Sequence, residues 1–380
     1  MGGKSAREYL EAIWERYRDA GRKYKKLILD EFCRVCGHHR KHAIRLLRAR
    51  QRPARRRKAS GRPPRFGVVE RHVLTRIWLF GNRPCSRRLK SMLASWLPFY
   101  ERRYARLAPS VRENLLGLSK NTIDRLLLPT RRRYGTRGRS GTRPGTLLHN
   151  QIPIKTEHWT IAQPGFMQAD TVAHCGSSLG GEFVWSLTFT DVFSGWTENR
   201  AVWNKGATGV REQLADIEEG LPFRLQGFHS DNGSEFLNHH LHRHYAERQL
   251  PIIQTRGRPR RGNDSAHVEQ KNWTHVRQLL GYQRIDVPTL IPQINTLYRT
   301  WALFNNFFCT NLKLVAKKKI GSRYRKTYDE PKTPYQRLMD SGLLNEAEKT
   351  HLTELACNLN PFSLKNQIDH QQRQVLNTLR

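Results

Sequence analysis

Negative charge is scarce in this chain. Its 380 residues contain 32 Asp and Glu against 67 Lys and Arg, a formal net charge of +35, and the pI is near 10.7. So large an excess of one sign predicts a polyanionic partner, and nucleic acid is the physical expectation. Because acids are few, each one that stands in an apolar context needs a specific explanation.

Long apolar runs and a cysteine framework are also missing. No stretch of about 18 apolar residues occurs, which excludes a membrane-spanning helix, and the first residues contain no apolar signal-peptide region. The six cysteines are scattered, which indicates a reducing compartment rather than a disulfide-stabilised secreted domain. We therefore expect a cytoplasmic, nucleoid-associated protein with no membrane partner. Its hydrophobic content of 37% still suffices for two to three domains.

Three acids stand where a carboxylate is unusual. Asp170 lies in the middle of a predicted strand, where aspartate is disfavoured. Asp231 ends another predicted strand just before a helix, and the carboxyl ends of strands are where open α/β sheets form sites. Glu269 opens a predicted long helix and falls on the same face as its apolar stripe of Ala266, Trp273, Val276 and Leu280. A carboxylate on an inward face must be paired, metal-bound or protonated.

The segments around these acids alternate in the manner of an α/β domain. Strand character occurs in five runs, and a helical pattern follows the third of them, at residues 206–219. The predicted strands are residues 166–173, 183–191, 196–203, 223–230 and 251–255. Three convergent carboxylates favour Mg²⁺ or Mn²⁺, which prefer oxygen ligands, and a pair of ions roughly 3.5–4 Å apart can stabilise in-line phosphoryl displacement.

These residues resemble a known family. Asp170, then Asp231 in the sequence Asp-Asn-Gly-Ser-Glu-Phe, then Glu269 after 37 intervening residues are similar to the Asp-Asp-Glu core of retroviral-type integrases and insertion-sequence transposases, with a last gap slightly longer than is typical. The resemblance covers about residues 150–310. It implies a ribonuclease-H-like α/β core with a five-stranded mixed sheet flanked by helices.

The resemblance also implies a chemistry. Asp170, Asp231 and Glu269 would be both catalytic residues and ligands of two Mg²⁺ ions, for which Mn²⁺ can substitute. The reaction would be cleavage and strand transfer at the terminal inverted repeats of a mobile element in a prokaryotic host, without a covalent protein–DNA intermediate. Because two element ends must be joined to target DNA in concert, a homo-oligomer on DNA is expected.

Other interpretations of the same residues stay open. Asp231-Asn-Gly is a good turn by itself. Asp191, Asp216, Glu235 and Asp264 compete as acids but are expected to be structural, as are His229 and His267. Two alternative functions are a non-catalytic, sequence-specific DNA-binding protein, which leaves the inward acids unexplained, and a metal-dependent nuclease without joining activity.

Residues 1–49 predict a helix-turn-helix DNA-binding domain, because a basic helix follows a turn at Gly37. The DNA contacts expected there are Arg40, Lys41 and Arg45. Cys33-x-x-Cys36 with three nearby histidines invites a zinc interpretation, but no second ligand pair has finger-like spacing, so packing roles are preferred. The nearby histidines are His38, His39 and His42.

A basic linker at residues 50–67 precedes a second helical domain at 68–133. The linker contains three prolines and no acids, and its Arg56 and Arg62 are expected to contact DNA. In the second domain, a helix capped by Ser119 resembles a recognition helix with Lys120, Asn121 and Arg125 towards DNA; a plain helical bundle is the alternative.

Residues 134–160 predict a linker into the catalytic core at 161–310, and a basic C-terminal domain of unpredicted fold follows at 311–380. A basic loop just before Glu269 is expected to contact DNA near the cleavage site. Lys271 and Arg277, beyond Glu269 on its helix, either bind phosphates or lie on a solvated face. The DNA contacts expected in the loop are Arg256, Arg258 and Arg260.

Overall fold

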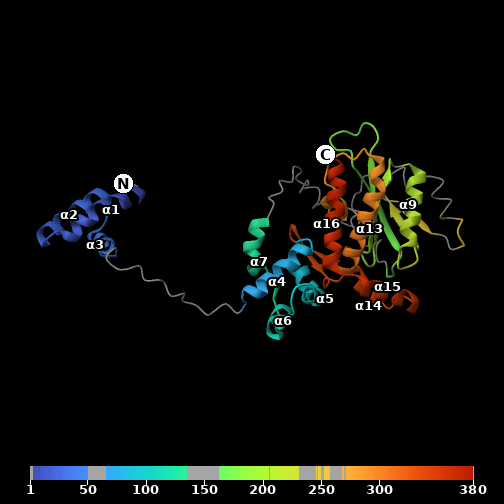
Figure 1. Cartoon of the computed structure of the whole chain (residues 1–380), viewed down its shortest axis with the longest axis horizontal. Helices are drawn as coiled ribbons and strands as arrows, with labels where there is room; N and C mark the ends of the chain where they lie inside the picture. Colours follow the sequence, from blue (N-terminus) through green and yellow to red (C-terminus); the bar gives the residue numbers. More distant parts are fainter. Residues whose placement is uncertain are drawn as a thin grey trace. The chain divides into compact units, whose positions relative to one another are not determined.

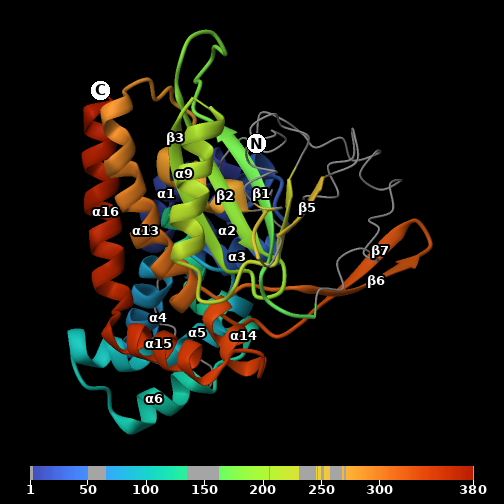
Figure 2. The same ribbon diagram turned by 90° about the vertical axis from the view of Figure 1, so that its right-hand side faces the viewer.

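The computed structural model describes residues 3–49, 66–134, 162–204, 206–230, 245, 247–249, 252–256, 268 and 271–379. The chain forms two compact units, Met1–Arg65 (unit 1) and Phe66–Arg380 (unit 2). Each unit is described by itself below; Figure 1 labels most of the helices, and Figure 2 adds labels for most of the strands. Within the described residues, none of the helices is both long and apolar enough to cross a membrane.

Unit 1 is a bundle of three helices, α1 (Gly3–Asp19), α2 (Arg22–Cys36) and α3 (Arg40–Ala49). Gly37 ends α2 with a left-handed backbone (φ 66°), the conformation that glycine adopts most easily at the end of a helix. The three helices surround a small core of their own, made by Ile13, Ile28, Leu29, Phe32, Ala43 and Leu47. The predicted helices and glycine turn are therefore present.

A five-stranded mixed sheet lies at the centre of unit 2, in the order β3-β2-β1-β4-β5. The first three strands form an antiparallel meander, whereas β4 runs parallel to β1 and β5 parallel to β4. The predicted mixed sheet flanked by helices is thus confirmed. The strands are β1 (Phe166–Ala173), β2 (Val184–Asp191), β3 (Thr197–Trp203), β4 (Gly227–Ser230) and β5 (Ile253–Arg256).

Both faces of β2 are largely buried, although only one of them is apolar. In β2, Leu187 and Phe189 alternate with buried hydroxyl residues, Ser186 and Thr188 among them. Helix α9 (Ala207–Glu219) covers the face of Leu187, because Arg200, opposite Leu187 in the register, bonds into that helix. Asp170, opposite Thr188, lies on the other face.

That second face is met by a helical segment built from η3 (Asn272–Arg277) and α12 (Gln278–Leu280). Its η3 part is a π-helix, not the α-helix that the sequence predicted. Because hydrogen bonds from i to i+5 turn the following side chains away from the 3.6-residue period, the predicted stripe is only partly correct. Val276 and Leu280 are buried, but Trp273 is 52% exposed.

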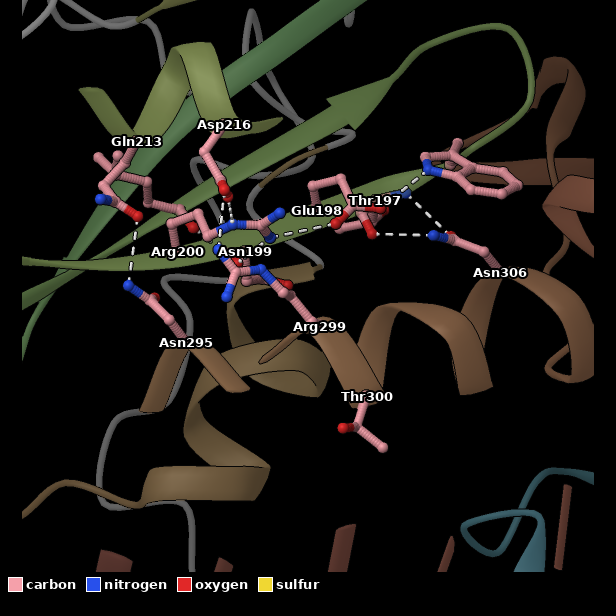
Figure 3. Close-up of polar contacts among 12 residues, drawn as sticks. Thr197, Glu198, Asn199, Arg200, Gln213, Asp216, Asn295, Arg299, Thr300 and Asn306 are labelled. Carbon is pink, nitrogen blue, oxygen red and sulfur yellow. Dashed lines mark hydrogen bonds and ion pairs between the residues drawn. The ribbon is translucent and has the colours of Figure 1, made fainter. Parts of the chain in front are cut away.

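Helix α13 (Ile291–Phe308) closes the sheet edge at β3, as Figure 3 shows. The Asn295 amide accepts from the backbone N–H of Ala201 (2.6 Å) and donates to its carbonyl (3.3 Å). Asn306 makes the same pair of bonds with Thr197, at 3.0 and 3.1 Å. Two buried side chains therefore satisfy backbone groups that an open edge strand would leave available for pairing with another chain.

The segments expected as separate domains at 68–133, 161–310 and 311–380 share one hydrophobic core. The Trp96 ring lies edge-on to Phe304 (centroids 6.1 Å apart) and Phe362 (5.4 Å), which joins α5, α13 and α16. Aromatic residues of all three segments thus complete a single interior. The helices involved are α4 (Val68–Phe80), α5 (Ser86–Arg103), α6 (Pro109–Leu116), α7 (Lys120–Tyr134), α14 (Pro334–Asp340), α15 (Glu346–Asn358) and α16 (Pro361–Thr378).

The C-terminal segment also contains a hairpin that the sequence did not predict. Strands β6 (Leu314–Ile320) and β7 (Arg323–Tyr328) pair with each other and form a sheet separate from the central one. Figure 2 shows this hairpin extending away from the helices of unit 2.

Candidate functional site

Among the described residues, Thr171 and Asn272 donate hydrogen bonds to the carboxylate of Asp170 on β1. The backbone N–H of Thr171 donates to Oδ1 (2.8 Å), and the side-chain amide of Asn272 donates to Oδ2 (2.6 Å). The side chain is half-buried. The carboxylate therefore has a fixed orientation, set partly by its own strand and partly by the first residue of η3.

Gln168 makes a second link between the same strand and the same helical segment. Because side chains alternate along a strand, Gln168 and Asp170 lie on one face. Gln168 is fully buried, and its Oε1 accepts from the backbone N–H of Val268 at 3.2 Å. Val268 and Asn272 therefore both contact β1, at Gln168 and at Asp170, which are two residues apart on the strand.

The strand register brings a third part of the chain to this place. Ala169 of β1 lies opposite Ser230, the last residue of the parallel strand β4. Asp170 follows Ala169 in the sequence, and Asp231 follows Ser230. Glu269 likewise follows Val268. Asp231 and Glu269 themselves are outside the described residues, so the prediction that the three acids converge rests on these flanking positions.

His229 lies close to the site, but its described contacts do not indicate a catalytic role. It stands opposite Gln168 in the register of β1 and β4, is buried, and its Nδ1 lies 3.0 Å from the hydroxyl of Thr255 on β5. This contact is consistent with the expected structural role. His267 is outside the described residues.

Lys271 and Arg277, for which phosphate binding and a solvated face were the two predicted alternatives, both contact backbone carbonyls of the protein. Lys271 donates through Nζ to the carbonyl of Gly195 (3.3 Å), and burial lowers the pKa of its ammonium to about 8. Arg277 donates to the carbonyls of Ala173 (3.1 Å) and Gly281 (3.3 Å). Both side chains thus fasten the helical segment to neighbouring backbone.

The competing acids Asp191 and Asp216 have structural partners. Asp191 is buried and accepts from the backbone of Gly165 (3.0 Å) and from the backbone and hydroxyl of Ser194 (2.6 and 2.5 Å). Burial raises the pKa of its carboxyl, against the lowering effect of these bonds. Asp216 bonds to two arginines on the α9 side of the sheet. Glu235 and Asp264 lie outside the described residues.

The other predicted DNA contacts are spread over both units. In α3, Arg40 pairs with Asp30, and Arg45 lies 2.9 Å from the ring of His42. In α7, which Ser119 caps by accepting from the Thr122 N–H (3.2 Å), the predicted side chains are exposed. These exposed residues are Lys120, Asn121 and Arg125. Lys41 is exposed on α3, the backbone of Arg256 ends β5, and Arg56, Arg62, Arg258 and Arg260 lie outside the described residues.

Comparison with known proteins places the chain in a family. No protein-family model matches it. The uncharacterized protein y4rM of Sinorhizobium fredii (strain NBRC 101917 / NGR234) is 38% identical over 337 residues, covering 87% of this chain and 94% of that protein. The chain belongs to the y4rM family. A crystal structure of the catalytic core domain of BIV integrase aligns with the chain with a TM-score of 0.31 and 19% identity, covering 47% of this chain and 95% of that one.

In this y4rM-family protein, sequence reasoning missed two residues of the site, Gln168 and Asn272. Each had a signal in its spacing. Gln168 precedes Asp170 by two residues, which places both on one face of a strand. Asn272 follows Glu269 by three residues, the spacing of neighbours on one helix face. A polar residue at either spacing from a candidate ligand is a candidate positioning residue.

The cysteine pair of unit 1 packs beside the core. Cys33 and Cys36 are partly buried against the core of the three helices, and burial raises the pKa of the Cys36 thiol. The His38 ring contacts Phe32 (centroids 5.7 Å) and His42 (4.9 Å). Within the described parts of both units, no three or more His, Cys, Asp or Glu side chains are grouped so as to hold a metal ion.

Proposed function

We propose that this y4rM-family protein is a DNA transposase of insertion-sequence type, which catalyses metal-dependent cleavage and strand transfer at the ends of a mobile element. One observation carries the proposal. The register of β1 with β4 and the bond from Val268 to Gln168 bring the positions next to Asp231 and Glu269 against the strand that holds Asp170. Asp170 and the residues that precede Asp231 and Glu269, although far apart in the sequence, therefore lie close together.

The sheet topology supports a ribonuclease-H-like, integrase-type core. Three antiparallel strands followed by two parallel ones, in the order β3-β2-β1-β4-β5, are what such a core requires. In this arrangement Asp170 belongs to the first strand and Asp231 follows the fourth. The strand order and the place of Asp170 on β1 therefore support the proposed polynucleotidyl transferase activity, as does the spacing of the three acids in the sequence.

The residues fit hard divalent cations. Asp170 offers carboxylate oxygens in a fixed orientation, and the Oδ1 atom of Asn272 is buried without a hydrogen-bond partner in the described part of the chain. We propose that Asp170, Asp231 and Glu269 hold two Mg²⁺ ions, or Mn²⁺ in their place. The ions would supply positive charge that stabilises the attacking and leaving oxygens of in-line phosphoryl transfer. Asn272 and Gln168 would keep β1 and the helical segment in position.

The DNA-binding roles of the flanking helices are part of the proposal. In unit 1, the basic helix α3 follows the Gly37 turn, an arrangement compatible with a helix-turn-helix. In unit 2, α7 presents Lys120, Asn121 and Arg125 to solvent. We propose that these two helices bind the element's terminal inverted repeats, and that the protein acts as a homo-oligomer that brings two ends to target DNA.

The decisive experiment is a joining assay with matched variants. Wild type, Asp170→Asn and Glu269→Gln are incubated with Mg²⁺ or Mn²⁺ and pre-nicked DNA carrying the element's end sequence. Glu219→Gln, an exposed position at the end of α9, is the control for the loss of one negative charge. Joining is expected in the wild type and control, and it is expected to vanish in the two site variants and in EDTA while DNA binding persists.

The same assay separates the alternatives. Metal-dependent cleavage without joined products would indicate a nuclease. Binding without any metal-dependent reaction would indicate a non-catalytic DNA-binding protein. Joining retained in Asp170→Asn or Glu269→Gln would contradict the assignment of the site.

A further inference from the structure

The β6–β7 hairpin concentrates positive charge without any compensating acid. Residues 314–328 contain six Lys or Arg and no Asp or Glu. The register places like charges directly opposite each other twice in succession, Lys317 with Lys326 and Lys318 with Arg325. Because like charges in opposed positions destabilise a strand pair, the sequence of this hairpin works against its own pairing.

The hairpin has no core to offset that repulsion. Its two strands form a sheet of their own, and nearly every side chain on both faces is exposed. Even the apolar residues Val315 and Ile320 are 66% and 55% exposed. A two-stranded hairpin is at best marginally stable in water by itself. These features indicate that the hairpin is a binding surface for a polyanion, whose negative charge would offset the repulsion between the two strands.

The base of the hairpin, in contrast, is firmly attached. Asp329 accepts from the backbone N–H of Lys313 (2.7 Å) and from the Arg337 guanidinium on α14 (2.5 Å). Arg87 on α5 donates to the carbonyls of Tyr328 (3.2 Å) and Asp329 (2.8 Å). The hairpin is therefore an arm with a fixed base and exposed strands, and Figure 2 shows it extending from the rest of unit 2.

The base also adjoins the candidate site. Lys313 donates through Nζ to the carbonyl of Phe193, and Lys271 donates to the carbonyl of Gly195 in the same turn. Lys271 directly precedes Asn272, which holds Asp170. A duplex bound along the hairpin would consequently be positioned relative to the site through one short turn.

We propose that the β6–β7 hairpin is a DNA-binding arm that enters the major groove of a duplex. Strands about 4.8 Å apart make a ribbon that fits a groove about 12 Å wide but not a minor groove about 6 Å wide. Alternation places three cations on each face of the hairpin, Lys317, Lys319 and Lys326 on one face and Lys318, Arg323 and Arg325 on the other. Each face would therefore direct three cations towards the phosphates that line one side of the groove. The proposal rests on the proposed function for the identity of the DNA.

The test is the salt dependence of DNA binding, measured by fluorescence anisotropy with the full-length protein in EDTA. The hairpin variant replaces Lys317, Lys318, Arg325 and Lys326 by Gln. A control variant removes four exposed cations of unit 2 outside the hairpin, so that the net charge changes equally. The control positions are Arg71, Lys90, Arg106 and Arg211.

Four lost phosphate contacts should reduce the slope of log K against log salt by about 3 to 4, since each contributes about 0.9. The control should change the slope by less than about 1, because distant charges release few counterions from the site. Equal slopes in the two variants would overturn the proposal. So would the same loss in a charge-preserving variant, with Arg for each Lys and Lys for Arg325, because that loss would reflect the hairpin's fold.

An RNA duplex of the same sequence tests groove entry. The major groove of A-form RNA is deep and narrow, so the hairpin variant should alter the slope for DNA far more than for RNA. Equal effects on both duplexes would exclude groove insertion in favour of general phosphate attraction. An unchanged DNA slope combined with lost binding to an acidic protein or an anionic vesicle would assign the hairpin a different partner. Since no catalysis is measured, failure of this proposal is distinguishable from failure of the joining assay.

Discussion

Two arginines that bond to the same carboxylate should differ greatly in their contribution to stability. Arg200 on β3 and Arg299 on α13 both bond to Asp216, at 2.5 and 2.8 Å (Figure 3). The Arg200 side chain is 5% exposed and that of Arg299 is 52% exposed. Arg200 also bonds to Glu198 at 3.2 Å, whose side chain is only 10% exposed.

Arg200→Met removes the cation that faces Glu198 and leaves that buried carboxylate without a compensating charge from Arg200, although the indole N–H of Trp196 still donates to it (3.0 Å). Loss of one partner of a buried pair costs about 3–5 kcal/mol, because the remaining charge is uncompensated. Arg299→Met removes an exposed partner of a partly exposed carboxylate, and such pairs contribute about 0–1 kcal/mol. The two variants make the same chemical change, so each is the control for the other.

The cost of Arg200→Met should also depend on pH. Burial raises the pKa of Glu198, and Arg200 is the main group that lowers it, so removal of Arg200 raises the folded-state pKa further. An acid whose folded pKa exceeds its unfolded value of about 4.3 binds a proton more tightly when folded. The destabilisation should therefore be small near pH 4, and it should grow as pH rises through the folded pKa.

Urea unfolding followed by tryptophan fluorescence measures these free energies in unit 2, because eight of the nine tryptophans lie there and only Trp14 lies in unit 1. The double variant Glu198→Gln with Arg200→Met removes the uncompensated charge, and it should be more stable than Arg200→Met alone. Equal destabilisation by Arg200→Met and Arg299→Met, or a cost that does not change between pH 5 and pH 8, would refute the reasoning.

Three further outcomes are expected. Asn306→Ala leaves two buried backbone groups of β3 without their hydrogen-bond partner, so it should lower the free energy of unfolding by about 2 to 4 kcal/mol. Asn305→Ala should cost about 1 kcal/mol or less in the same urea assay. Asn272→Ala removes one of the hydrogen bonds that orient the Asp170 carboxylate and should reduce the joining rate at least about tenfold with DNA affinity unchanged; an unchanged rate would exclude a positioning role. Burial lowers the pKa of His174 to about 3, so stability is lost as pH falls from about 6.5 towards 3, and His174→Gln should flatten that loss in acid unfolding curves.

The central sheet could be predicted because its signals are local. Strand composition and turn residues located the strands, and Asp170 was unusual enough within its strand to mark it as a candidate site residue. The Ser119 cap and the two ends of α4 are likewise determined by residues that are close in sequence. Such features depend on few contacts distant in sequence, and the pattern alone therefore suffices.

Contacts between residues distant in sequence decide the features that the local pattern does not show. The alternation of hydroxyl and apolar residues in β2 is typical of a half-exposed strand, yet Ser186 is buried because its hydroxyl bonds to Tyr298 of α13 (2.6 Å). Trp273 is apolar but largely exposed, since a π-helix changes the period. The hairpin was missed because a run of lysines carries little strand propensity.

The turn at residues 191–195 connects these separate findings. Buried Asp191 holds the turn through Ser194, while Lys313 from the hairpin base and Lys271 beside the site both donate to its carbonyls. A side chain on Gly195, whose φ is +79°, would come within 2.6 Å of the Asn311 amide. Burial raises the pKa of Asp191 and lowers that of Lys313 to about 8. Polar groups are retained here at a cost in desolvation, which is the expected character of a junction that would fix the proposed DNA-binding arm relative to the strand that holds Asp170.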